Sequence, residues 1–153
     1  EKPAGVANQD IRSLCINRAS SEEWKQLYGI GPVLADRIVK FRSALGGFAR
    51  VEQVAETYGL PPETYVSISK QLTRTTDHTR IPVNLATTEM LASHPYINLR
   101  QARSIAGYIK HHGALTSVED LYQVHSLSPD DIDRFAEYMD FSTSEGTVTA
   151  IGN

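Results

Sequence analysis

Two glycines separated by one apolar residue are the residues of this 153-residue chain best suited to hold a charged ligand. Gly29 and Gly31 lack a Cβ and adopt positive φ without strain, so a phosphate can approach the backbone amides of such a hairpin closely. Pro32 suits the first position of a helix. The free amides and positive dipole end of that helix would add to the attraction for an anion. Residues 27–38 therefore predict a phosphate-binding turn.

Basic side chains follow the turn. Arg37, Lys40 and Arg42 fall on the next helical turns and would supply charge along one strand of a duplex. Such contacts fix a protein on a nucleic acid without reading its bases. A second interpretation stays open, because Gly-apolar-Gly between helices is also a tight turn in which Ile30 fills the core.

Other chemistry finds little support in the residues. The chain contains neither a glycine-rich nucleotide loop nor a nucleophile with a matching base. The single cysteine, Cys15, can form neither an internal disulfide nor a zinc site alone. His111 and His112 are neighbours on a predicted helix and point in different directions. We expect no catalysis, no metal, no cofactor and no small-molecule substrate.

An internal repeat organises the chain. An offset of 67 residues pairs Asn17 with Asn84 and Ile38 with Ile105, without a gap. Such a period is typical of tandem structural units. The resulting segments are an N-terminal extension (1–14), repeat 1 (15–73), a polar linker (74–81), repeat 2 (82–141) and a polar tail (142–153). We expect both ends of the chain to be mobile.

Each copy predicts four short helices and no convincing strand. In the first copy, Ser20 and Glu23 form a capping box, and the helix that begins at Pro32 carries an apolar stripe until Gly46-Gly47 ends it. A third helix is predicted over residues 50–58, and a fourth after Pro62. The second copy has its own capping residues, which are Thr87, Ser117 with Asp120, and Ser128.

The order of these features resembles the competence protein ComEA family of DNA-uptake receptors. That family also has an Asn-x-Ala-(Ser/Thr) cap, a Gly-Ile-Gly hairpin, a Gly-Phe segment, here Gly47-Phe48, and a Val-Glu-x-(Val/Leu) helix. The resemblance covers residues 11–141 and is most specific in the first copy. It implies an all-α fold of two tandem helix-hairpin-helix pseudo-repeats, SAM-like with four short helices each. It also implies non-catalytic, sequence-independent binding to double-stranded DNA, in DNA uptake.

Carried over by position, the family's DNA-contacting hairpin falls on Tyr28, Gly29, Ile30 and Gly31, with the helix-start amides of Val33 and Leu34. A second hairpin falls on residues 58–61. It has one glycine, Gly59, and Pro61 where an amide is needed, so we expect a weaker contact or none. The family setting is extracytoplasmic and membrane-anchored. No apolar run here reaches the roughly 18 residues that span a bilayer, so such an anchor would lie outside this sequence.

The second copy departs from the hairpin pattern. Gly29 becomes Tyr96, whose side chain should hinder a phosphate, and Gly31 becomes Asn98, which can still hold a left-handed turn. Arg100, Arg103 and Lys110 follow on a helix. They form either an ordinary solvated face or a supplementary electrostatic contact to DNA.

Charge is distributed unevenly. The chain has a net charge of −3, with about +2 on residues 1–75 and −5 on residues 76–153. A DNA binder usually carries a basic face, which favours repeat 1 as the binding part. The alternative is a protein-interaction or scaffold module of the cell envelope. The acidic face at residues 119–140 of repeat 2 would then contact a protein partner.

Overall fold

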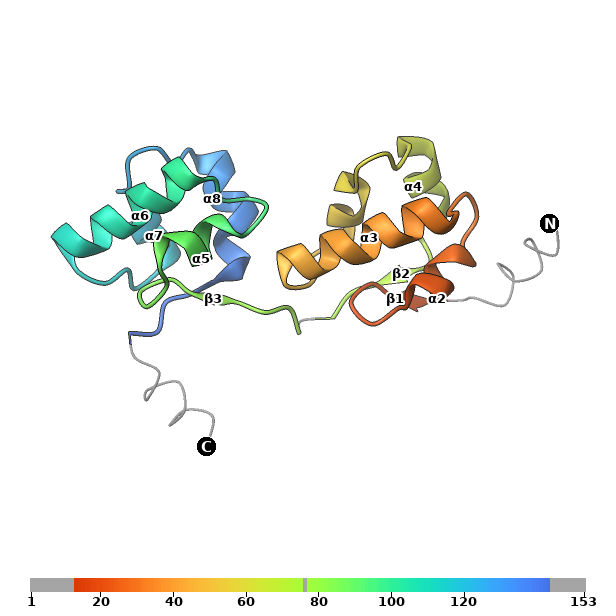
Figure 1. Cartoon of the computed structure of the whole chain (residues 1–153), viewed down its shortest axis with the longest axis horizontal. Coiled ribbons are helices and arrows are strands. Elements are labelled where there is room, and N and C mark those ends of the chain that lie inside the picture. The colour runs from red at the N-terminus through yellow and green to blue at the C-terminus, as the bar shows by residue number, and fades with distance from the viewer. Residues whose placement is uncertain (1–12, 76, 144–153) are drawn as a thin grey trace, which may run out of the picture. The chain divides into compact units, whose positions relative to one another are not determined.

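The computed structural model describes residues 13–75 and 77–143. It divides into two compact units, residues 1–78 and 79–153, which contain repeat 1 and repeat 2 respectively (Figure 1). The predicted N-terminal extension (1–14) and polar tail (142–153), and the mobility expected of them, lie almost wholly outside the described residues.

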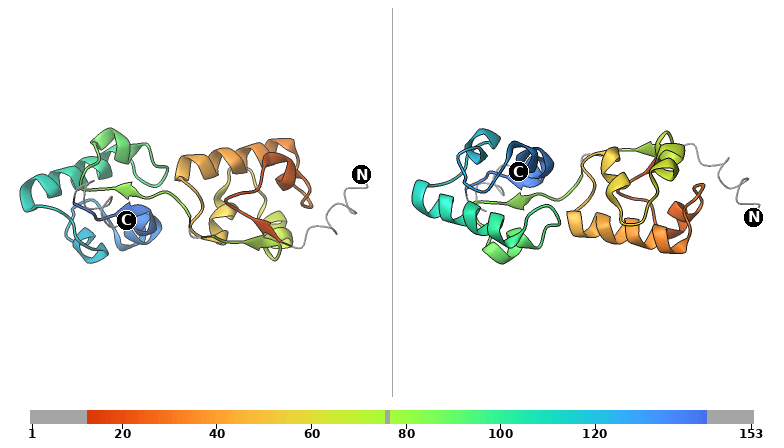
Figure 2. Two further views of the ribbon diagram at one scale, coloured as in Figure 1. Left: turned by 90° about the horizontal axis from the view of Figure 1, so that it is seen from below. Right: turned by 90° about the horizontal axis from the view of Figure 1, so that it is seen from above.

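Repeat 1 is a small helical unit closed by two short strands. Its elements in chain order are β1 (Leu14–Cys15), α2 (Ser21–Lys25), α3 (Pro32–Leu45), the 3₁₀ helix η1 (Val51–Glu56), α4 (Pro62–Ser69) and β2 (Leu72–Thr73). The strands are parallel, with Leu14 opposite Leu72, so the first and last segments of the repeat lie side by side (Figure 2).

Local signals account for the boundaries of these helices. The capping box predicted before α2 is confirmed, because Ser20 Oγ accepts from the Glu23 amide at 3.2 Å and Glu23 Oε1 accepts from the Ser20 amide at 2.9 Å. Pro32 is the first residue of α3, and Gly46 ends that helix with a φ of 84°. Glycine suits this end because a left-handed C-cap strains any residue that carries a Cβ.

An asparagine and an apolar core join the elements of repeat 1. The Asn17 side chain donates to Phe48 O at 2.8 Å and accepts from the Phe48 amide at 2.6 Å. This pair fixes the turn after α3 against the chain that leaves β1. The largest side chains that are almost fully buried in this repeat are Trp24, Phe48, Leu27, Ile38, Leu45 and Ile68.

Repeat 2 has the same plan. Its elements are β3 (Ile81–Pro82), α5 (Thr88–Ala92), α6 (Leu99–His112), α7 (Val118–Leu121), α8 (Pro129–Phe135), the 3₁₀ helix η2 (Ala136–Tyr138) and β4 (Met139–Asp140). Strands β3 and β4 pair in parallel. Asn84 takes the role of Asn17, donating to Leu115 O and accepting from the Leu115 amide, both at 2.8 Å. The all-α fold of two tandem repeats is confirmed.

Two local predictions are wrong. Each repeat does contain strands, but strands of two residues are too short to produce an alternating pattern in sequence. The third helix predicted in repeat 1 is present, as a six-residue 3₁₀ helix. The Ser117 side chain makes no capping bond. Asp120 instead accepts from the Thr116 amide at 2.8 Å and from its hydroxyl at 2.9 Å.

No helix in the described part of the chain is long and apolar enough to cross a membrane.

Candidate nucleic-acid interface

In the hairpin between α2 and α3, one glycine has a backbone conformation that would strain any other residue. Gly29 has a φ of +81°, a region that favours glycine because other residues place their Cβ too close to the backbone. The next residue, Ile30, is buried and its amide donates to Leu27 O at 3.1 Å. Ile30 thus fills the core, as one interpretation of the hairpin predicts, while the glycine beside it makes the turn.

Gly31 has a different geometry from Gly29. Its φ of −91° and ψ of −175° are extended, so the left-handed turn lies at Gly29 and not at Gly31. A Cβ built on Gly31 would meet no heavy atom within 4 Å. Neither backbone conformation nor packing therefore requires glycine here, and the space beside this residue is open.

The N-terminus of α3 presents free backbone donors to that space. The first helical bond runs from the Ala35 amide to Gly31 O at 2.9 Å. The amides of Val33 and Leu34 precede it and have no carbonyl within the helix. No side chain among the described residues caps this helix, and its first turn contains no acidic residue. The helix end is therefore electropositive and accessible to an anion.

The two hairpins of repeat 1 lie against each other's helices. A Cβ on Gly29 would come within 2.9 Å of Thr64 Cγ2 on α4, and one on Gly59 would overlap the Arg37 guanidinium on α3. Gly59 has a φ of +83°, almost the value of Gly29. The tyrosines that precede the two glycines, Tyr28 and Tyr58, are 71% and 81% exposed. The hairpins thus form one continuous surface.

The first of the predicted basic residues lies between the hairpins. Arg37 donates to Tyr58 O at 3.2 Å, and its guanidinium lies over the Tyr58 ring at 4.8 Å from the centroid. The Arg37 guanidinium lies where a Cβ on Gly59 would be, while Gly59 itself is exposed and has a φ that favours glycine. Its role as a secondary DNA contact stays a prediction.

The other two predicted basic residues differ in their surroundings. Lys40 forms an exposed ion pair with Asp36 at 2.9 Å. Arg42 turns inward, where Nη1 donates to Ile16 O at 3.0 Å and to Ala19 O at 2.6 Å. Desolvation by burial lowers the pKa of the Arg42 guanidinium from its ordinary value. Arg42 stabilises the loop before α2, and helical spacing alone could not distinguish it from Arg37.

The second hairpin offers fewer donors. Pro61 and Pro62 have no amide hydrogen, and the Thr64 amide donates to Pro61 O at 3.0 Å. The first turn of α4 also contains Glu63, which disfavours an anion. This geometry agrees with the expectation of a weaker contact there.

Repeat 2 closes the corresponding hairpin. Asn98 Oδ1 accepts from the Gln101 amide at 2.8 Å, and Gln101 Oε1 accepts from the Asn98 amide at 2.9 Å. Asn98 has an extended backbone with a φ of −88°, so the left-handed turn predicted for it is wrong. The side chains of this capping box occupy donors that are free in α3.

Tyr96, whose side chain is predicted to hinder a phosphate, is 6% exposed, and its amide donates to His94 Nδ1 at 3.1 Å. Its ring packs at 6.0 Å from that of Tyr138, and the Arg134 guanidinium lies 4.2 Å above it. An aromatic side chain with a buried partner turns inward because burial of the ring is favourable. Arg100, Arg103 and Lys110 of α6 are exposed, which leaves both interpretations of that face open.

Comparison with known proteins identifies the class. The model of the helix-hairpin-helix motif family matches residues 10–73 and 76–140, and the chain belongs to that family. Its motif points to nucleic-acid binding. No solved structure matches the chain.

Curated relatives share most of this chain. It is similar to proteins named endonuclease/exonuclease/phosphatase family domain-containing protein 1, with 27% identity in Danio rerio and 30% in Mus musculus. The alignments cover 94% and 84% of this chain but only 30% and 28% of those relatives. The chain thus spans less than a third of their length, and their printed name describes the whole proteins.

One feature of the site was missed in the sequence. Residues 27–32 and 57–62 share a Tyr-Gly-apolar-x-Pro order at an offset of 30. This shorter repeat within repeat 1 would have indicated that the second hairpin has the same turn as the first, as the φ values of Gly29 and Gly59 show.

Proposed function

We propose that this chain binds double-stranded DNA without sequence preference and without catalysis, through backbone phosphates at the first hairpin of repeat 1. The observation that carries the proposal is the open N-terminus of α3, which lacks both a side-chain cap and an acidic first turn. Gly31 leaves space for a phosphate oxygen to reach the amides of Val33 and Leu34.

The basic and exposed residues around this helix end complete the proposed interface. Arg37 and Lys40 supply positive charge along α3, and the exposed Tyr28 borders the turn. Contacts to phosphate from amides and cations carry no base information, so the binding is sequence-independent. We leave Arg42 out of the interface because its guanidinium hydrogen bonds to Ile16 and Ala19. Gly59 is left out because the Arg37 guanidinium lies beside it and already donates to Tyr58 O.

The comparisons support a nucleic-acid partner more than a particular pathway. The nuclease terms in the names of the relatives agree with DNA or RNA as the partner. They offer no support for a role in DNA uptake. The alternative of a protein-interaction module is favoured by the acidic net charge and by the changed hairpin of repeat 2, in which Tyr96 and Asn98 replace the two glycines.

Substitutions at Gly31 test the proposal while preserving the fold. Gly31→Asn copies Asn98 and should cap the Leu34 amide, which leaves stability unchanged or higher by a few tenths of a kcal/mol. Loss of a charge-assisted hydrogen bond should weaken affinity for a duplex of arbitrary sequence by roughly tenfold. Gly31→Asp should weaken it further, because its carboxylate repels phosphate. Fluorescence anisotropy at low and physiological salt measures both effects.

A matched control separates local geometry from net charge. Ala114→Asp adds the same charge at an exposed position of repeat 2 and should change affinity less than twofold. Affinity of the wild type should fall by about 0.9 log unit per log unit of salt for each phosphate contacted. Wild-type affinity in both Gly31 variants would contradict binding at this hairpin. Absence of binding at low salt would contradict DNA binding altogether.

A further inference from the structure

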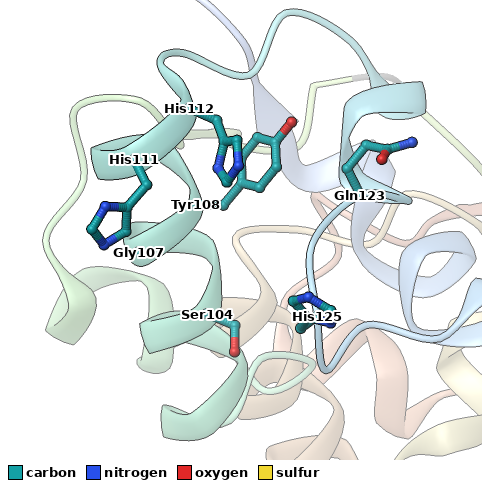
Figure 3. Close-up of a pocket in the computed structure, with 7 residues that line it drawn as sticks. All are labelled: Ser104, Gly107, Tyr108, His111, His112, Gln123 and His125. Atoms are coloured by element: carbon teal, nitrogen blue, oxygen red, sulfur yellow. The ribbon is translucent and has the colours of Figure 1, made fainter.

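Repeat 2 contains a groove that the DNA proposal does not use. It has a volume of about 390 Å³, a size typical of small-molecule sites. Two segments of the repeat form it, one face of α6 and the chain after α7 (Figure 3). The lining residues are Ser104, Gly107, Tyr108, His111, His112, Gln123 and His125.

The groove lies where repeat 1 has large side chains. At the offset of 67, Ser104 and Gly107 correspond to Arg37 and Lys40. In repeat 1 the Arg37 guanidinium spans from α3 to the second hairpin. In repeat 2, Ser104 takes the place of Arg37 and Ser126 takes the place of Gly59. The hydroxyls of these two serines hydrogen bond at 3.1 Å. The shorter bridge leaves the space beside it open.

Two local features near the groove cost stability. Gly107 lies inside α6, where glycine is a poor helix former, yet a Cβ there would meet nothing within 4 Å. Ser126 takes the place of Gly59 in the hairpin turn with a similar φ of +79°, a left-handed conformation that is unfavourable for a residue with a side chain. Departures of this kind concentrate at functional sites.

The lining favours a flat, anionic ligand. Tyr108 and His112 stack with ring centroids 4.4 Å apart and planes at 17°, which offers an aromatic wall. Figure 3 shows Gln123 and His125 across the gap from these rings. The lining contains no carboxylate, and imidazoles can donate hydrogen bonds to anions. Arg100, exposed one turn before Ser104, adds charge on the same face of α6.

A metal ion suits the groove less well. Among residues 13–75 and 77–143, no group of three or more His, Cys, Asp or Glu side chains could hold one.

We propose that this groove binds a nucleoside monophosphate, either free or as the phosphorylated end of a nucleic-acid strand. The base stacks on the Tyr108–His112 wall, and the phosphate accepts hydrogen bonds from the opposite side of the groove, where His125 lies. This site is separate from the hairpin of repeat 1 and does not depend on DNA binding there.

Titration of the ¹⁵N-labelled full chain with deoxyadenosine monophosphate tests the proposal by NMR. Saturable shifts are expected for the amides of residues 104–112 and 123–126. Deoxyadenosine and inorganic phosphate should each bind at least tenfold more weakly, because each lacks one part of the ligand. A 5′-phosphorylated single strand that binds more tightly than the mononucleotide identifies a strand end as the ligand, and the reverse order identifies the free nucleotide.

Two substitutions and a control assign the binding to the groove. Gly107→Leu should fill it and weaken nucleotide binding at least tenfold, while Ala114→Leu, outside the lining, should not. His125→Ala, at an exposed position, provides a second test that does not depend on tolerance of a new side chain in α6. It should weaken binding at least fivefold.

Several results would overturn the proposal. They are wild-type binding in both groove variants, equal binding of phosphate or nucleoside alone, and saturation of these amides by zinc but not by the nucleotide. The Gly31→Asp variant should keep nucleotide binding, so failure of the DNA proposal and failure of this one are distinguishable.

Discussion

The long helices of the two repeats begin in the same way and present different chemistry. The turn before each helix is closed by equivalent bonds, Ile30 N to Leu27 O at 3.1 Å and Ile97 N to His94 O at 3.0 Å. In α3 the next residue is Gly31, and the helix amides stay open. In α6 it is Asn98, whose side chain caps them. One N-cap residue can therefore change which helix-start amides are available while preserving the fold.

The second hairpins of the two repeats also differ in the side chains that lie beside them. Repeat 1 places Arg37 against Tyr58 and Gly59, which gives a filled, basic surface. Repeat 2 places Ser104 against Ser126 and leaves a groove. The two copies thus conserve a core and vary the helix faces around the hairpins. Substitutions that exchange residues between the copies can break or sharpen this comparison.

The largest expected effect comes from removing the buried ring of Tyr96, the residue that replaces Gly29 in repeat 2. Tyr96→Ala should destabilise repeat 2 by about 3–5 kcal/mol, because it empties the space between Tyr138 and Arg134. The single tryptophan, Trp24, lies in repeat 1. Its fluorescence transition in urea should stay unchanged while the circular dichroism transition acquires an earlier phase.

Tyr122→Ala provides the control, since Tyr122 is half exposed and should cost less than about 1 kcal/mol. A simultaneous shift of the Trp24 transition in the Tyr96 variant would contradict independent unfolding of the repeats.

The two hairpin glycines of repeat 1 should respond unequally. Gly29→Ala should destabilise repeat 1 by about 1–3 kcal/mol, because a Cβ is strained at this φ and comes within 2.9 Å of Thr64. Gly31→Ala should cost less than about 1 kcal/mol, since its backbone is extended and its surroundings are open. Urea denaturation followed by Trp24 fluorescence measures both. Equal costs would show that the two glycines have the same structural role.

Substitution of Arg42, whose guanidinium faces inward, should change the stability of the protein more than its affinity for DNA. Arg42→Ile copies Ile109 of repeat 2 and removes the donor to Ile16 O and Ala19 O. We expect a loss of roughly 1–2 kcal/mol. Affinity for DNA, measured by anisotropy under conditions where the variant is folded, should change less than twofold. Arg37→Ser, which copies Ser104, should weaken binding more. The opposite order would restore Arg42 to the interface.

The smallest expected effect is a pH dependence of stability at Asp120 of repeat 2, which Gln53 of repeat 1 should not show. Asp120 corresponds to Gln53, whose Oε1 accepts from the Ala49 and Arg50 amides at 2.6 and 2.7 Å. Hydrogen bonds from the amide and hydroxyl of Thr116 hold the pKa of Asp120 below its ordinary value of 3.8. Since the folded-state pKa is the lower one, the stabilisation is fully present above about pH 4. It is lost as the pH falls through the folded value.

Comparison with Asp120→Asn isolates this contribution. The wild type should be the more stable protein at pH 6, and the difference should shrink as the pH falls below 3.8. Gln53 carries no charge, so its equivalent bonds should not respond. A difference that is constant from pH 6 to pH 2.5 would contradict the role of the carboxylate.

The sequence predicted the helices more accurately than it predicted the contacts of the candidate site residues. The offset of 67 residues and the capping residues Ser20, Thr87 and Ser128 located the helices, because caps act within one helical turn. The two-residue strands were missed, since each depends on a partner nearly sixty residues away. The direction of Arg42 was missed as well, because helical spacing places Arg37, Lys40 and Arg42 on α3 without identifying what each contacts.

By itself, the sequence determined the tandem helix-hairpin-helix organisation and the turn at Gly29. These depend on glycine, proline and capping chemistry between near neighbours. Tertiary structure decided which polar groups remain available. Arg37 is held at the second hairpin because Tyr58 O accepts from it across two helices, Tyr96 is buried because Tyr138 and Arg134 pack against it, and the groove is open because Ser104 is short. Each outcome depends on contacts between residues distant in sequence, which local patterns do not encode.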